Sequence, residues 1–171
     1  QGQLERIPEY SFCGCNLSAL TLPNSVKSIG MYAFADNPAM KSAVLGDNVK
    51  LIDNYAFSGC SNLADLDLGN SLVTIGDYAF QSIGSKVNTG LNVVFPNTLS
   101  TIGEFAFKAS GISSITIPNS VTKIGDGAFR SCGSLISINI PNSVTNIGNE
   151  AFSCCDSLTK IIIPCSVVNM N

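Results

Sequence analysis

The side chains best suited to chemistry in this sequence are seven cysteines and one closely spaced pair of aspartates. The chain has no histidine, which excludes Ser-His-Asp and Cys-His nucleophile systems and every zinc site that needs an imidazole. Asp65 and Asp67 alternate along a short apolar stretch. Paired carboxylates can work as acid and base or bind calcium, but no third ligand or nucleophile accompanies them. We therefore interpret the pair as a solvated acidic spot.

The cysteines do not have the spacing of a zinc site. Cys13-x-Cys15 and Cys154-Cys155 stand at opposite ends of the chain, whereas a zinc ribbon needs two C-x-x-C pairs. We expect free thiols that are buried as small hydrophobic groups, and no cofactor or metal. A disulfide between Cys132 and Cys155 and a zinc site are the alternatives.

Internal repetition explains where these residues stand. An isoleucine returns every 22 to 27 residues, a phenylalanine follows each of these five positions later, and a small residue precedes every phenylalanine. The isoleucines are Ile7, Ile29, Ile52, Ile75, Ile102, Ile124 and Ile147, and the phenylalanines are Phe12, Phe34, Phe57, Phe80, Phe107, Phe129 and Phe152. A fixed period in this range is typical of a solenoid in which each unit stacks on the one before.

Each unit contains the same predicted elements. The stretch I-G-x-x-A-F is too short for a regular helix, so we expect one helical or 3-10 turn there, on the convex side. Alternating apolar residues then predict parallel strands about 4.8 Å apart over 19–22, 43–45, 66–68, 93–95, 115–117, 138–140 and 161–163. Proline ends most of these strands, and an Asn-Ser turn, whose side chains are expected to bond nearby backbone, leads to a second short extended segment.

The fourth unit is about four residues longer than its neighbours, between Phe80 and Val93. Insertions in solenoids form a loop on one face. A tolerated surface loop costs little free energy and is the simpler interpretation. The alternative is a contact loop near Ser85 to Gly90.

The pattern I-G-x-x-A-F-x-x-C-x-x-L-x-x-I-x-I-P-x-S-V resembles the BspA-like (Treponema pallidum-type) leucine-rich repeats over essentially the whole chain. The resemblance implies a right-handed repeat solenoid with short parallel strands on its concave face. It also implies a cell-surface or secreted protein that adheres to proteins, including host extracellular matrix or cell-surface proteins. The family has no catalytic motif, so no catalytic residue is carried over. Pro8 and Asp53 replace the usual glycine and depart from the pattern.

These observations predict a non-enzymatic protein–protein interaction module that binds through its concave sheet. The candidate contact residues are Val44, Asp65, Asp67, Val94, Thr116, Asn139 and Ile162. A structural spacer or self-assembling surface element without a specific ligand, including end-to-end self-association, is the alternative. The net charge of −3, without clustered Lys or Arg, argues against nucleic acid as a partner. No apolar run is long enough to insert into a membrane.

The same pattern predicts one solenoid of about seven units over residues 1–171. The chain begins with Gln1 and shows no signal peptide or capping unit. We expect it to be a fragment of a longer array.

Overall fold

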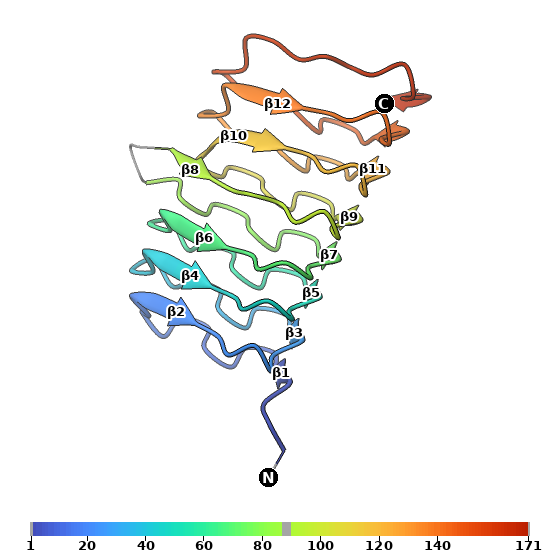
Figure 1. Ribbon diagram of the computed structural model, residues 1–171. Coiled ribbons are helices and arrows are strands. Elements are labelled where there is room, and N and C mark those ends of the chain that lie inside the picture. Colours follow the sequence, from blue (N-terminus) through green and yellow to red (C-terminus); the bar gives the residue numbers. More distant parts are fainter. Residues whose placement is uncertain (1, 87–89, 171) are drawn as a thin grey trace.

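The computed structural model describes residues 2–86 and 90–170, which wind into a parallel solenoid of about seven turns (Figure 1). The predicted repeat solenoid is therefore confirmed. Two rows of short parallel strands run along it. We call the row that is unbroken the continuous sheet and the other, which splits into two runs, the interrupted sheet.

The continuous sheet is built from the two residues that end at each repeated isoleucine and from one further pair that ends at Met170. Its strands pair in the order β1 (Arg6–Ile7), β3 (Ser28–Ile29), β5 (Leu51–Ile52), β7 (Thr74–Ile75), β9 (Thr101–Ile102), β11 (Lys123–Ile124), β13 (Asn146–Ile147) and β14 (Asn169–Met170). Isoleucine pairs with isoleucine in successive strands, as Ile29 does with Ile52. The isoleucines point inward and are buried, because a hydrophobic column on one face of a stacked ladder is continuous only in this register.

The interrupted sheet contains β2 (Ala19–Thr21), β4 (Ser42–Val44) and β6 (Asp65–Asp67) in one run, and β8 (Leu91–Asn92), β10 (Ile112–Thr116) and β12 (Ser137–Asn139) in the other. Side chains alternate along each strand. In β6, Leu66 is buried between the exposed Asp65 and Asp67. The predicted alternation is confirmed, although most strands begin one residue or more earlier than the sequence pattern predicts.

Two of the predicted strands are not formed. Residues 93–95 follow β8 without pairing as a strand. Residues 161–163 form no strand either, and the backbone bridge next to them joins Ser137 and Lys160. The first departure follows the long fourth unit. The second missing strand, at residues 161–163, has a neighbouring coil on one side only among the described residues. Ile161, Ile162 and Ile163 are therefore exposed.

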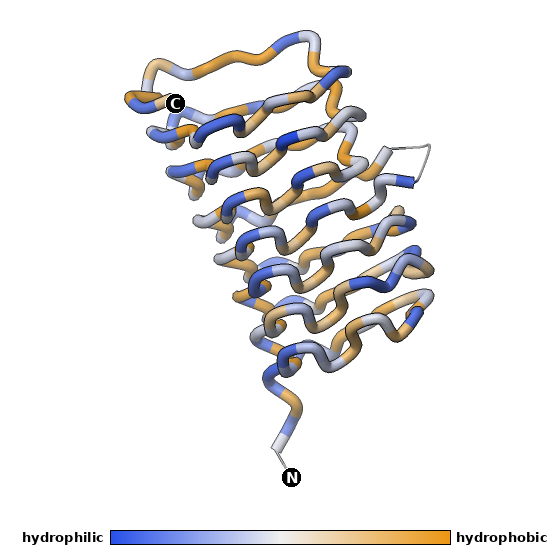
Figure 2. The backbone as a smooth tube through the Cα atoms, turned by 180° about the vertical axis from the view of Figure 1, so that it is seen from behind, coloured by the Kyte–Doolittle hydropathy of each residue, from blue (hydrophilic) through white to orange (hydrophobic). Residues whose placement is uncertain are grey.

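The stretch after each isoleucine is a run of β-turns; among the described residues no helix or 3-10 turn is formed there. The Ala33 N–H donates to the Gly30 carbonyl at 3.2 Å, whereas the Phe34 N–H donates to Ala56 of the next coil at 2.8 Å. Residues three and seven positions after each isoleucine have positive φ, for example 54° at Tyr32. These left-handed residues prevent a helix, because they turn alternate N–H groups toward the neighbouring coil. Figure 2 shows these wavy segments stacked one above another.

Two columns of aromatic rings stack along these turns. The inner column contains the repeated phenylalanines, of which Phe34, Phe57, Phe80, Phe107 and Phe129 are fully buried. Successive rings in it lie 5.2 to 5.7 Å apart between centroids. The outer column runs through Tyr10, Tyr32, Tyr55, Tyr78 and Phe105 at 4.7 to 5.0 Å and is only partly buried, as predicted.

The Asn-Ser turns connect one coil to the next, rather than bonding mainly within their own turn as expected. The hydroxyl groups of Thr98, Ser143 and Ser166 donate to carbonyls of Leu72, Val121 and Val144, one coil earlier, at 2.8 Å each. A polar side chain at this position therefore satisfies a backbone acceptor that the tight bend leaves unpaired.

Candidate functional site

The seven candidate contact residues are all exposed on the outer surface of the interrupted sheet or its extension. Val44 lies in β4, Asp65 and Asp67 in β6, Thr116 in β10 and Asn139 in β12. Val94 follows β8 and is 81% exposed, and Ile162 is 65% exposed beyond the last paired strand. The structure brings three of the seven together around one hollow.

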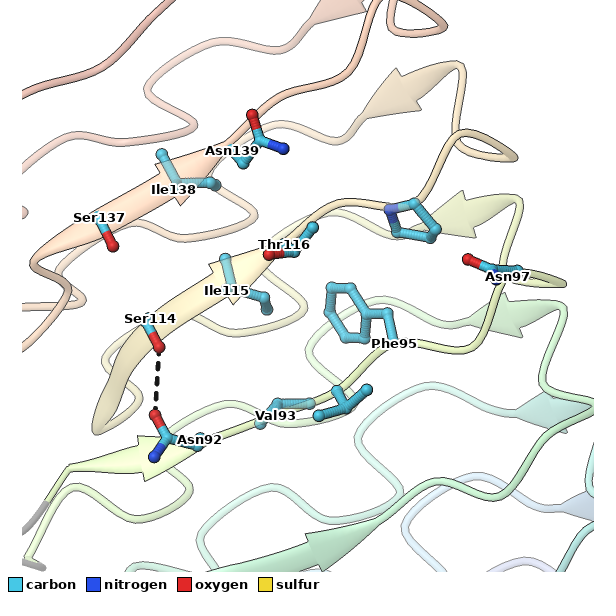
Figure 3. A pocket seen from close by; sticks show the side chains of 12 residues that line it. Asn92, Val93, Phe95, Asn97, Ser114, Ile115, Thr116, Ser137, Ile138 and Asn139 are labelled. Carbon is cyan, nitrogen blue, oxygen red and sulfur yellow. Dashed lines mark hydrogen bonds between the residues drawn. The ribbon is translucent and has the colours of Figure 1, made fainter.

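This hollow, which we call the strand hollow, has a volume of about 440 Å³ and spans three successive coils. Its lining includes the predicted Val94, Thr116 and Asn139. Figure 3 shows side chains from β8, β10, β12 and the stretch beyond β8 around it. The polar lining residues outside the seven candidates are Asn92, Asn97, Ser114 and Ser137. All lining residues are uncharged.

The strand hollow forms where the fourth coil leaves its neighbours. In regular coils the backbone N–H of the residue that follows a strand donates to a backbone carbonyl of the next coil. The Leu45 N–H donates to the Asp67 carbonyl at 3.0 Å, and the Ile117 N–H donates to the Asn139 carbonyl at 3.1 Å. Among the described residues, Leu68 makes no such bond to Val94. The pairing of β8 with β10 also shifts register between Ile112 and Ser114.

The long fourth unit directly precedes this site in the sequence. The contact-loop alternative placed the function at Ser85 to Gly90, of which residues 87–89 lie outside the described residues. Ser85 and Lys86 are exposed. The chain that follows the insertion takes an altered course, and its residues Asn92, Val93, Val94, Phe95 and Asn97 line the strand hollow on one side.

Charged side chains lie on both sides of the strand hollow along the interrupted sheet. Asp65 and Asp67 belong to β6, which contacts β8. On the opposite side of the strand hollow, the backbone of Lys160 forms an isolated parallel β-bridge with Ser137 of β12. All three side chains are exposed, and none of the ion pairs among the described residues includes them. From β6 to the last coil, the face therefore runs from acidic through uncharged to basic.

Three cysteines, Cys60, Cys132 and Cys155, have a structural part in the stack of turns. Cys15 stands at the same repeat position but is exposed, so the expectation of a buried thiol is wrong there. Among the described residues no disulfide is formed, and Cys60 and Cys132 are fully buried. In four coils the residue eight positions after the repeated isoleucine donates to the phenylalanine carbonyl of the preceding coil. The donors are Asn37, Cys60, Cys132 and Cys155, and the acceptors are Phe12, Phe34, Phe107 and Phe129, at 2.8, 3.3, 3.0 and 3.2 Å.

This burial makes the alkaline stability of the protein depend on Cys60. Burial raises the pKa of the Cys60 thiol from its ordinary value of 9.0 to about 12. Between these values the unfolded chain loses a proton that the folded chain keeps, so the free energy of unfolding falls as pH rises, by about 1.4 kcal/mol per pH unit for one thiol. Urea unfolding of the reduced protein at several pH values above 9 measures this slope.

Cys60→Ser is the matched variant, because serine already occupies this column at Ser110 and keeps a donor without an ionisable thiol. We expect a shallower loss of stability above pH 9 in the variant, because it lacks the buried thiol that ionises on unfolding. An identical slope in both proteins would contradict the assignment of the raised pKa.

The described residues contain no group of three or more Cys, Asp or Glu side chains positioned to hold a metal ion. Asp65 and Asp67 remain a pair, and the Asp67 carboxylate accepts a hydrogen bond from the Gly69 N–H at 2.9 Å. Among the described residues there is no helix with the length and apolar character that crossing a bilayer requires.

Comparison with known proteins places the chain in a family. The model of the BspA type leucine-rich repeat region matches residues 1–91 and 81–171. A leucine-rich repeat protein of T. pallidum is 32% identical with a TM-score of 0.83, and the match covers 91% of this chain and 72% of that one. No curated protein sequence matches the chain.

Two further structures extend the comparison. A leucine-rich cell-surface protein of Faecalibacterium prausnitzii is 30% identical with a TM-score of 0.75; the match covers 91% of this chain but only 42% of that one. The pneumococcal vaccine antigen PcpA is 21% identical with a TM-score of 0.58 over 86% of this chain and 42% of its own, and shares the fold. The family model over the full length and the match to the T. pallidum protein establish that this chain belongs to the BspA type leucine-rich repeat family.

Proposed function

We propose that this domain is a non-enzymatic protein-binding module of a cell-surface or secreted protein, and that it binds through the outer surface of the interrupted sheet. The observation that carries the proposal is the strand hollow, an uncharged depression that includes Val94, Thr116 and Asn139 on an otherwise regular ladder. Repeat solenoids bind through extended surfaces of this kind. Membership of a repeat family with cell-surface members supports the location.

The proposed contact residues differ in how much each is expected to contribute to the binding affinity. Val94, Thr116 and Asn139 line the hollow and would be covered completely by a partner, whereas Val44 and Ile162 lie further along the face. Residues at the centre of an interface contribute most of its affinity, because water is excluded there. We therefore expect the largest losses from changes at Thr116 and Asn139.

Thr116→Arg and Asn139→Arg should each lower the affinity for a protein partner at least tenfold, because a bulky charge in the hollow blocks contact and would be desolvated. Surface plasmon resonance against a panel of purified extracellular-matrix and cell-surface proteins measures this. Thr101→Arg is the matched control, since Thr101 is an exposed threonine on β9 of the continuous sheet.

A partner that binds wild type and Thr101→Arg equally, but not the two hollow variants, would support the proposal. Retained binding in the hollow variants, equal loss in all three, or no binding to any protein of the panel would contradict it. Circular dichroism and urea midpoints verify that all variants are folded.

Self-association without a specific ligand is the second candidate, and a specific observation favours it. The first described coil exposes the aromatic rings of Tyr10 (56%) and Phe12 (42%), and the last exposes Val168 (75%) and Met170 (59%). Contiguous exposed apolar groups favour contact with another surface. Sedimentation equilibrium at increasing concentration discriminates the two candidates, because a strict monomer excludes self-assembly through these coils.

A further inference from the structure

We propose that the strand hollow and the charges beside it bind an extended segment of a partner protein that carries a basic, an aliphatic and an acidic side chain at alternate positions. The proposal rests on the function proposed above and adds the chemistry of the partner. Three features of the described residues support it: the lining of the hollow, the charges on its two sides, and the backbone groups at its edge.

The lining suits one aliphatic side chain surrounded by backbone amides. Val94 is 81% exposed at its rim, and the uncharged amides and hydroxyls of Asn92, Ser114 and Asn139 can bond to peptide groups. A charged group placed there would lose its hydration without gaining an opposite charge. The only aromatic ring in the lining, Phe95, is 6% exposed, so no ring face is available for stacking with a sugar.

The flanking charges specify what stands on either side of the aliphatic residue. Asp65 and Asp67 on β6 attract a basic group, and Lys160 beyond β12 attracts an acidic one. Because these side chains form no ion pair with other described residues, a partner does not have to displace one. Complementary charges across an interface determine its orientation and partner choice more than its total affinity.

The spacing of the coils matches that of an extended chain crossing the strands. Neighbouring coils are about 4.8 Å apart, so β10 at the middle of the hollow is roughly 10 Å from the rows of Asp67 and Lys160. Alternate residues of an extended segment lie about 6.6 Å apart and point to the same side. The flexible stems of Lys or Arg and of Glu span the remaining distance.

The backbone at the edge of the hollow also lacks its regular ladder partners. Two bonds that the regular coils form are missing among the described residues: the one from the Leu68 N–H to the Val94 carbonyl, and the one from the Phe95 N–H to the Thr116 carbonyl. Polar backbone groups without a ladder partner favour bonding to water or to another chain. An extended segment that crosses the strands has its own N–H and C=O groups unpaired, so single peptide groups of it can bond to this edge without forming a further ladder.

Selection of a displayed library of random peptides against the immobilised protein tests the proposal. Enriched sequences should share Lys or Arg, then Leu, Ile or Val, then Asp or Glu at alternate positions, in one chain direction or the other. A synthetic peptide of this pattern should bind at least tenfold more tightly than the same peptide with serine in place of the aliphatic residue.

Variants that reverse the charge of Lys160 or of the Asp65 and Asp67 pair test which end of the peptide each side chain recognises. Lys160→Glu should shift the preferred peptide from an acidic to a basic residue at that end, and the double variant Asp65→Lys, Asp67→Lys should shift the other end from basic to acidic. Rescue of binding by the matching charge-swapped peptide would support the assignment. Enriched peptides without the pattern, no enrichment at all, or affinity unchanged by the charge exchanges would overturn it.

Thr116→Arg separates this proposal from the function on which it rests. If a protein partner is lost in Thr116→Arg while the charge variants bind it as wild type does, the face binds protein but the basic–aliphatic–acidic pattern is wrong. If Thr116→Arg leaves both the protein partner and the selected peptides bound, both proposals fail. Selective binding of glycans instead of peptides would also contradict the partner chemistry.

Discussion

Gly125→Ala is expected to destabilise the protein by roughly 3 kcal/mol, because the added methyl group would collide with the backbone of the preceding coil. A Cβ atom built on Gly125 lies 2.7 Å from both the carbonyl carbon and the carbonyl oxygen of Gly103. The φ of Gly125 is not in the left-handed region, so the cost comes from this close approach alone. The atoms it would meet are main chain and cannot move without spreading two coils of the continuous ladder.

The measurement is the urea midpoint, with the slope of the transition as a check that both proteins unfold alike. Gly133→Ala is the matched control: it makes the same chemical change, but its Cβ would meet nothing within 4 Å and its φ is not left-handed either. Gly133→Ala should change stability by no more than about 0.5 kcal/mol. Equal effects of the two substitutions would refute the steric explanation of the I-G step.

The second large effect is expected for the inner aromatic column. Phe107→Ala should cost about 4 kcal/mol, since it removes a fully buried ring and leaves a cavity that a stacked coil cannot close. The Phe107 ring lies 5.2 Å from Phe80, 5.5 Å from Phe129 and 5.5 Å from Phe95 between centroids, so one deletion affects three neighbours.

Phe12→Ala tests whether burial, rather than the residue type, causes this loss. Phe12 belongs to the same column but is 42% exposed and stacks on one ring, Phe34. We expect its loss to be less than half that of Phe107→Ala. Tyrosine fluorescence during urea unfolding reports the transition, because the chain has four tyrosines and no tryptophan. A loss in Phe12→Ala as large as that in Phe107→Ala would contradict the prediction.

Much of the fold could be predicted from the sequence because every coil buries the same residue types at the same repeat positions. The repeated isoleucine and phenylalanine columns are buried as the period predicts, and Leu66 is buried between two exposed aspartates as alternation predicts. Stacking depends only on the side chain one unit away, so a pattern that recurs in the sequence recurs in space. The same reasoning placed the outer aromatic column at the surface.

The path of the backbone between these columns could not be read from residue types. Tyr32, Tyr55 and Tyr78 adopt positive φ, a conformation that non-glycine residues rarely adopt. Hydrogen bonds to the neighbouring coil compensate for it, and those bonds exist only after stacking. A local reading of I-G-x-x-A-F therefore predicted a helical turn, although the folded chain forms β-turns.

The candidate site, too, could be predicted from the sequence only in part. The strand alternation identified Val94, Thr116 and Asn139 as outward-facing residues, but not that they surround one hollow. The candidate contacts do not include Asn92, Asn97, Ser114 and Ser137, because the hollow depends on the departure of residues 93–95 from both neighbouring coils. The length of the fourth unit indicated that something differs there, without indicating where the chain would be displaced.

By itself, the sequence determined the stacking of the coils, the buried columns and the face that carries the variable side chains, because each follows from a period in one dimension. The tertiary structure decided the conformation of the turns, the break in the interrupted sheet, and the placement of an uncharged hollow between Asp67 and Lys160. These features arise from hydrogen bonds and close contacts between coils, which residue types and spacing do not specify until the coils are brought together.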